Sequence, residues 1–246
     1  MLEAGRLRAP DCARGPAGRD FGMVNAARID NWLFDLDNTL YPSTCNLFAE
    51  MDGRMRAFIR DALGVDDGEA RRLQQGYYLS HGTTLCGLME LHGLAPEEFV
   101  EFVHDIDIGA VAPDPALDSA LGRLVGRKIV FTNGSARHAE RVLERLGVAR
   151  RFEAVFDIAA ANYVPKPRPE PYAEIVRRFA LVPARTAMID DAARNLAPAA
   201  ALGMTTVWVR TPSPHGREGA DGPHVHHVAD PLGEFLSRVL EASEPR

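Results

Sequence analysis

The chain contains few cysteines, and they form no pattern. Its 246 residues include only Cys12, Cys45 and Cys86, which lie far apart and make no C-x-x-C pair. An odd number of scattered thiols argues against a disulfide framework, because such frameworks use paired cysteines in oxidising compartments. We therefore expect a protein of the reducing cytoplasm.

Long apolar segments and an excess of positive charge are also missing. No apolar run approaches the roughly 18 residues that a membrane-spanning helix needs. The 34 acidic residues outnumber the 28 basic ones and give a net charge of -6, which argues against a nucleic acid polymer or an anionic membrane as partner. A small phosphorylated partner stays compatible with this charge, because a bound cation can reverse the local sign. The sequence leaves a monomer and a homodimer equally open.

The N-terminal region differs in composition from the rest. Residues 1–26 are rich in Gly, Ala, Arg and Pro, show no periodic apolar pattern and contain no hydrophobic segment typical of a secretory signal. We expect a disordered extension there. The sequence does not distinguish a start of translation at Met1 from one at Met23.

Beyond this extension, short apolar segments alternate with helical patterns. The segments "WLFDLD", "RKIVFTN", "AVFDI", "TAMIDD", "TTVWVR" and "HHVAD" are typical of strands, and stretches such as "ARHAERVLERLG" are typical of amphipathic helices. Such alternation indicates βαβ units. The sequence therefore predicts an α/β fold with a doubly wound, Rossmann-like parallel sheet.

One segment interrupts this alternation with helical patterns alone. In "LFAEMDGRMRAFIRDALG" the apolar residues Leu47, Met51, Met55, Phe58, Ile59 and Leu63 recur at nearly 3.6-residue spacing, and Gly64 predicts the end of the helix. We expect residues 45–112 to form an all-helical inserted domain, and residues 27–44 and 113–246 to form the α/β core.

Polar residues follow several predicted strands of the core. Asp35 and Asp37 end the first strand, Thr132 and Asn133 end the second, Asp190 and Asp191 end a later one, and Lys166 lies between the last two. Each alone is more often a turn residue or helix cap. Ligand sites of parallel sheets lie beyond the carboxyl ends of the strands, so these groups are expected to converge.

Four converging carboxylates repel one another unless a cation neutralises them. Hard oxygen ligands favour Mg²⁺, which also binds phosphate oxygens. In such a site one carboxylate can attack phosphorus, and the second can act as general acid and then as general base. A threonine hydroxyl and a lysine ammonium can hold the transferring oxygens.

The stretches "DLDNTLYP", "FTNG", "KPRPEPY" and "IDDAARN", in this order, resemble the four motifs of the haloacid dehalogenase-like phosphohydrolases. The inserted helices resemble the type 1 cap of subfamily I. The resemblance implies that Asp35 is the nucleophile, that Asp37 is the general acid and base, and that Thr132 and Lys166 bind the phosphoryl group.

The same resemblance implies an Mg²⁺ site. Asp191 is its direct ligand, the backbone carbonyl of Asp37 also reaches the metal, and Asp190 ligates it through water or supports the site. The predicted metal-binding residues are Asp35, Asp37, Asp190 and Asp191. Asn195 is expected to hold the loop of the last two by its side chain.

The stretches "YYLSHGTTLCGL", "VHDIDIGAVAPDPAL" and "ARHAERVLERLGVARRFEAVFDI" resemble the pyrimidine 5′-nucleotidase branch. This implies hydrolysis of nucleoside monophosphates such as UMP and CMP. From their own positions, Asn133 in "FTNG" is a candidate for phosphate contact, and His81 and Thr84 at a turn of the insertion are candidates for substrate contact. Of the pair Tyr77 and Tyr78 on one amphipathic helix, one is expected in the core and the other, Tyr78, is a candidate to stack on a base. Two alternatives stay open: a phosphatase for another metabolite, such as a sugar phosphate or phosphoglycolate, and a catalytically idle protein that binds a phosphorylated ligand or a partner.

Other interpretations of the acidic and histidine-rich stretches are weaker. A calcium loop at "DLDNTLYPSTCN" would need a glycine where Leu40 stands. A receiver domain places its acidic pair before the phosphorylated aspartate and has no helical insertion, and a true dehalogenase would lack Asp37. The "HVHH" stretch at 224–227 matches no usual zinc spacing.

Overall fold

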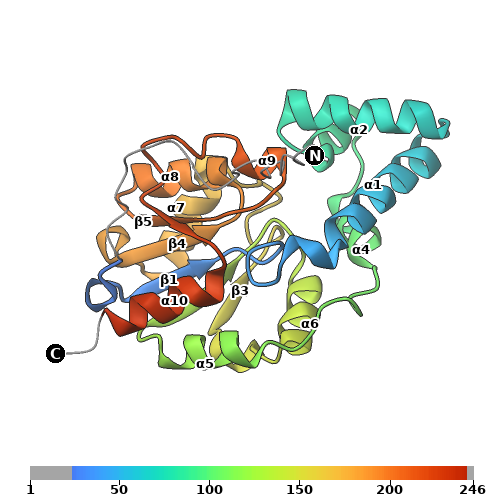
Figure 1. Ribbon diagram of the computed structural model, residues 1–246. Helices are drawn as coiled ribbons and strands as arrows, with labels where there is room; N and C mark the ends of the chain where they lie inside the picture. The colour runs from blue at the N-terminus through green and yellow to red at the C-terminus, as the bar shows by residue number, and fades with distance from the viewer. Residues whose placement is uncertain (1–23, 243–246) are drawn as a thin grey trace, which may run out of the picture.

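The computed structural model describes residues 24–242, and its centre is a parallel sheet with the strand order β3-β2-β1-β4-β5-β6 (Figure 1). The strands are β1 (Asn31–Phe34), β2 (Arg127–Phe131), β3 (Ala154–Phe156), β4 (Thr186–Asp190), β5 (Thr205–Val209) and β6 (His227–Ala229). The chain winds outward from β1 through β2 to β3, and then returns to the other side at β4. Ligand sites of doubly wound sheets lie at this reversal, beyond the ends of β1 and β4. The predicted fold class is confirmed.

Helices cover both faces of the sheet. One face carries α5 (Pro115–Arg123), α6 (Ala136–Leu146) and α10 (Leu232–Glu241), and the other carries α7 (Pro169–Phe179) and α8 (Leu196–Ala201) (Figure 1). Successive β1 residues alternate between these layers: Trp32 and Phe34 pack in one apolar cluster and Leu33 in the other, all with no exposed surface. Burial on both faces is the reason that this strand is apolar without interruption.

The helical insertion follows β1 and projects from one end of the sheet (Figure 1). It consists of α1 (Leu47–Leu63), α2 (Asp67–His81), α3 (Thr84–His92) and α4 (Pro96–His104). Asp66 caps α2 by accepting a hydrogen bond from the Glu69 N–H, and Thr83 caps α3 in the same way. Gly64 ends α1 in the left-handed conformation at φ 63°, as predicted. The exact boundaries of the two parts stay a prediction.

The structure differs from the sequence predictions in detail. Of the expected disordered extension, residues 1–23 lie outside the described residues, but Val24 is buried and a 3₁₀ helix begins at Ala26. A short helix, α9 (Pro214–Arg217), lies in the connection between β5 and β6. A 3₁₀ turn, Ala193–Asn195, precedes α8, and the Asp190 carboxylate accepts a hydrogen bond from the backbone N–H of Ala192 just before it. No helix among residues 24–242 combines the length and hydropathy needed to cross a bilayer.

Two helical glycines of the insertion test how tightly α2 and α3 pack. A Cβ on Gly87 would lie 2.4 Å from Cγ of Tyr77 and 2.5 Å from its Cβ, whereas a Cβ on Gly76 would meet nothing within 4 Å. We expect Gly87→Ala to lower the free energy of unfolding by about 1–3 kcal/mol through overpacking. The control, Gly76→Ala, should raise it by about 0.5–1 kcal/mol through helix propensity. Urea denaturation measures both, and equal effects would contradict this packing.

Candidate active site

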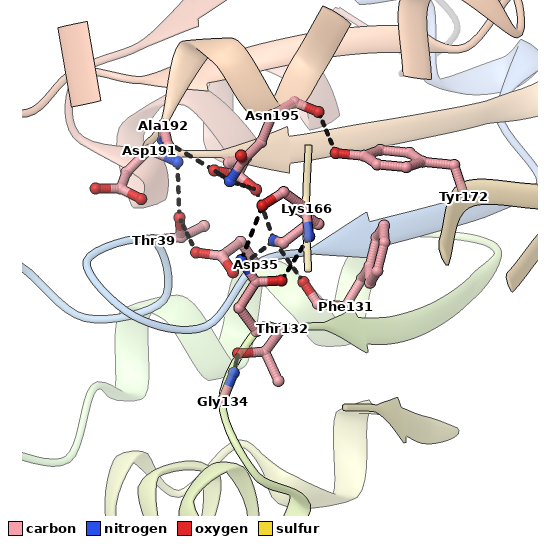
Figure 2. Close-up of polar contacts among 12 residues, drawn as sticks. Asp35, Thr39, Phe131, Thr132, Gly134, Lys166, Tyr172, Asp191, Ala192 and Asn195 are labelled. Atoms are coloured by element: carbon pink, nitrogen blue, oxygen red, sulfur yellow. Dashed lines mark hydrogen bonds and ion pairs between the residues drawn. The ribbon is translucent and has the colours of Figure 1, made fainter. Parts of the chain in front are cut away.

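A buried lysine connects the ends of three strands. The Lys166 ammonium donates hydrogen bonds to Asp35 Oδ1 at 2.8 Å, to Asp190 Oδ2 at 2.7 Å and to the Phe131 carbonyl at 2.8 Å (Figure 2). These three contacts use all three of its N–H groups. Lys166 itself is 2% exposed. The predicted convergence of Lys166 with the β1 and β4 carboxylates is therefore present in the structure.

The carboxylates around Lys166 lie in an environment that opposes their charge. Burial raises the pKa of Asp35 to about 7, against the attraction of Lys166. Burial, together with Asp35 and Asp190, raises the pKa of Asp191 to about 9. Burial lowers the pKa of Lys166, but the carboxylates of Asp190 and Asp35 more than offset this and raise it above its ordinary value. One ammonium therefore does not balance the acidic groups.

The Asp190 carboxylate is fully used by protein contacts. Besides Lys166, it accepts hydrogen bonds from the Ala192 backbone N–H at 2.8 Å and from the Asn195 side-chain amide at 3.1 and 3.2 Å. The predicted role of Asn195 in holding this loop is confirmed. Tyr172 in turn donates to the Asn195 carbonyl (Figure 2). Asp190 has no exposed surface, so its contacts suit support of Lys166.

Asp191, by contrast, keeps its carboxylate free of hydrogen bonds to residues 24–242 (Figure 2). Its backbone is fixed: its N–H donates to Thr39 Oγ1 at 3.0 Å, and its carbonyl accepts from Trp208 Nε1 at 2.7 Å. Ligand oxygens of Asp35, Asp190 and Asp191 lie within 4.8 Å of one another. An all-oxygen donor set with surplus negative charge fits Mg²⁺.

Asp37 is held on a different side, by an aromatic and an imidazole side chain. Its Oδ1 accepts hydrogen bonds from the Tyr41 hydroxyl at 2.5 Å and from His138 Nε2 at 2.9 Å. Burial raises the pKa of Asp37, but the charge of His138 and the hydrogen bonds from both partners outweigh it, so the net shift is downward. Its other oxygen, Oδ2, lies 3.6 Å from the position of a Cβ on Gly134.

The two polar residues after β2, Thr132 and Asn133, have different contacts. Thr132 is 2% exposed, and its Oγ1 accepts a hydrogen bond from the Gly134 N–H at 2.9 Å (Figure 2). The Asn133 side chain instead binds the Lys166 backbone, accepting from its N–H at 2.8 Å and donating to its carbonyl at 3.2 Å. Asn133 therefore braces the lysine loop, and its direct contact with phosphate stays a prediction.

The cap residues expected to touch substrate lie in three different environments. Thr84 is buried inside the cap and donates to the Gln74 carbonyl. His81 contacts Ser80 and lies 3.7 Å from Glu90. Tyr78 faces the core, where the Arg194 guanidinium lies 4.9 Å from its ring centroid. Tyr77 is the buried member of the tyrosine pair, at 6% exposure. The structure does not bring Thr84, His81 and Tyr78 together, and their contact with substrate stays a prediction.

The sequence interpretation missed three residues of the site. Thr39 joins two motifs, donating to Asp35 Oδ2 at 3.3 Å and accepting from Asp191; its place in a D-x-D-x-T pattern was the available signal. His138 contacts Asp37, and His104, the last residue of α4, lies 5.0 Å from His138 between ring centroids. No spacing in the sequence joins these two histidines to the first motif.

Comparison with known proteins identifies the class. The sequence profile of the haloacid dehalogenase-like hydrolases matches residues 29–203. The chain therefore belongs to this family.

Two curated relatives and one solved structure are similar to the chain. The Saccharomyces cerevisiae protein "Phosphate metabolism protein 8" is 28% identical over 70% of this chain. The match covers 59% of that protein's own length. The "Glyceraldehyde 3-phosphate phosphatase" of Methanopyrus kandleri is 30% identical over 72% of this chain and 82% of its own. A phosphatase structure from Thermococcus onnurineus, at 19% identity, covers 86% of this chain and 98% of its own with a TM-score of 0.59. This last likeness concerns the fold alone.

The proposed cation site predicts how a metal affects stability. Because Mg²⁺ would neutralise buried like charges, we expect it to raise the melting temperature. A free Mg²⁺ concentration of 100 times Kd adds about 2.7 kcal/mol to the free energy of unfolding. Asp191→Asn should raise the melting temperature without metal, because it removes a carboxylate whose pKa is raised, and should abolish the Mg²⁺ effect. Differential scanning calorimetry measures both. Glu241→Gln serves as control, because it also removes one carboxylate, but at an exposed position at the end of α10. An unchanged Mg²⁺ shift in Asp191→Asn would contradict the site.

Proposed function

We propose that the protein is an Mg²⁺-dependent phosphomonoester hydrolase that forms an aspartyl-phosphate on Asp35. The contact between Asp35 and Lys166 carries this proposal. Lys166 occupies Oδ1 of Asp35, while Oδ2 accepts only a long hydrogen bond, 3.3 Å, from Thr39 among the described residues. Oδ2 is therefore the oxygen better placed to attack phosphorus.

In the first step the Asp35 carboxylate bonds to phosphorus as the bond from phosphorus to the alcohol oxygen breaks. Asp37 gives a proton to that leaving oxygen. In the second step water attacks the same phosphorus, Asp37 takes the water proton, and Asp35 leaves as a carboxylate. Lys166 and Thr132 stabilise charge on the transferring oxygens. Mg²⁺, held by Asp35, Asp191 and the Asp37 carbonyl, would supply further neutralisation of that charge.

A cavity of about 190 Å³, lined by the Asp37 partner His138, suits the leaving group. It lies between cap helix α4 and core helix α6, and its lining includes His104, His138, Arg137 and Tyr163. A group bound there would lie next to His138, a partner of the proposed proton donor. The substrate is accordingly a small phosphorylated metabolite.

We further propose a pyrimidine nucleoside 5′-monophosphate as substrate, on the resemblance of the cap stretches. Tyr78 supports this, because a tyrosine on the cap that faces the core can stack on a base. A second candidate is a phosphorylated triose or sugar. It is favoured by the 30% identical relative whose name is "Glyceraldehyde 3-phosphate phosphatase" and by the absence of Tyr78 from the cavity lining.

The nucleophile is tested by Asp35→Asn. We expect this change to lower kcat by at least about 1000-fold with p-nitrophenyl phosphate and Mg²⁺, because an amide cannot form the acyl-phosphate. Asp30→Asn is the matched control, since Asp30 precedes β1 and pairs with Arg185 at the surface. Normal turnover by Asp35→Asn would disprove the aspartyl-phosphate route.

The substrate class is tested with a panel of phosphorylated metabolites compared by kcat/KM. We expect UMP and CMP to exceed glyceraldehyde 3-phosphate, glucose 6-phosphate and phosphoglycolate by about tenfold or more, the value of one good contact in a binding pocket. Tyr78→Ala should lower kcat/KM for UMP but leave that for p-nitrophenyl phosphate within a factor of about two. A preference for the triose or sugar phosphates would reject the nucleotide and favour the second candidate.

A further inference from the structure

Both identified contacts of the Asp37 carboxylate fall on the same oxygen. The Tyr41 hydroxyl and His138 Nε2 bind Oδ1, at 2.5 and 2.9 Å. Two donors on one oxygen fix the rotation of the carboxylate about its Cβ–Cγ bond. Oδ2 is left on the side of Gly134 and Thr132, because a Cβ on Gly134 would lie 3.6 Å from Oδ2 and 3.2 Å from Thr132 Oγ1.

His138 is more deeply buried than the carboxylate that it contacts. Its side chain has no exposed surface, whereas that of Asp37 is 18% exposed. His138 lies in the first turn of α6, where its backbone N–H donates to the capping hydroxyl of Ser135 at 3.2 Å. A residue fixed by a capped helix can orient a carboxylate at the end of a neighbouring strand.

The ring of His138 is fixed from the cap side as well. The His104 ring lies across it, with centroids 5.0 Å apart and planes 32° apart. Among the described residues, Nδ1 of His138 is buried without a partner, so Nε2 makes the only hydrogen bond of the ring. Buried polar atoms of proteins usually have a hydrogen-bond partner. Here the single satisfied nitrogen faces the proposed proton donor.

We propose that His138 is a positioning residue that aims Oδ2 of Asp37 at the leaving-group oxygen. The inference rests on the proposed function, since it requires Asp37 to transfer a proton in the first step. Without His138, the carboxylate can rotate, and the fraction of molecules with Oδ2 in place falls. The loss should be large when the leaving alcohol needs a proton and small when it leaves readily as an anion.

The experiment compares two esters: glycerol 2-phosphate, with an alkyl leaving group, and p-nitrophenyl phosphate, whose phenolate needs little protonation. The parameter kcat/KM covers the steps up to departure of the alcohol. We expect His138→Asn, whose amide ends short of Asp37, to lower kcat/KM about 10- to 100-fold for the alkyl ester. For the aryl ester the loss should stay below about threefold. His138→Gln, whose amide nitrogen can take the place of Nε2, should restore most of the difference.

Val142→Ala is the matched control, because Val142 is fully buried on the same helix. It should destabilise the fold without separating the two esters. Tyr41→Phe removes the second donor to Oδ1 and should reproduce the separation to a smaller degree, so the inference is tested even where a His138 variant does not fold. Equal losses on both esters, or no loss on either, would overturn the positioning role.

The outcomes also separate this inference from the proposed function. If Asp35→Asn is inactive and the His138 variants lose both esters equally, only the positioning role fails. If Asp35→Asn keeps full activity, or the unaltered protein hydrolyses neither ester, the proposed function fails and the positioning role fails with it.

Discussion

The contact of one buried ammonium with two buried carboxylates is the constraint on which the site depends. Lys166 reaches Asp35 on β1, Asp190 on β4 and the Phe131 carbonyl at the end of β2. Breaking a buried ion pair on one side leaves an uncompensated charge, so the three strand ends are held together. The lysine is placed in turn by Asn133, which binds both polar groups of its backbone.

The charge that remains explains why the same cluster suits a cation. Lys166 satisfies Asp190 and one oxygen of Asp35, but the Asp191 carboxylate receives no hydrogen bond within residues 24–242. A buried carboxylate without donors is costly when ionised, which its raised pKa of about 9 reflects. Support and ligation are thus divided between neighbours: Asp190 holds the lysine, and Asp191 keeps its oxygens for the proposed metal ion.

The sequence predicted those parts of the structure that depend on local pattern. The β1 segment is apolar and ends in acids, and parallel topology carries such ends to one edge, so the meeting of Asp35, Lys166 and Asp190 followed. His138 could not be found in this way, because it lies within α6 and not at the end of a strand, so the topology of the sheet does not place it beside Asp37. The period of α6 indicates only that the residue faces inward. Asn133 lies where predicted, yet its contacts depend on the path of the 157–168 loop, which no local pattern specifies.

Helix α6 connects the chemistry of the core to the placement of the cap. His138, Arg141 and Arg145 follow one another at spacings of three and four residues, so they share a face of the helix. His138 reaches Asp37, while Arg141 donates to the Ile106 carbonyl at 2.9 Å and Arg145 to the Val111 carbonyl at 2.9 Å.

These carbonyls belong to the segment that returns from the cap, directly after His104. The face of α6 that orients the proposed proton donor therefore also fixes where α4 ends. A shift of the cap would move His104 across the ring of His138. The proposed selection of the leaving group by the cap and the proposed proton delivery to it would consequently depend on one shared set of contacts.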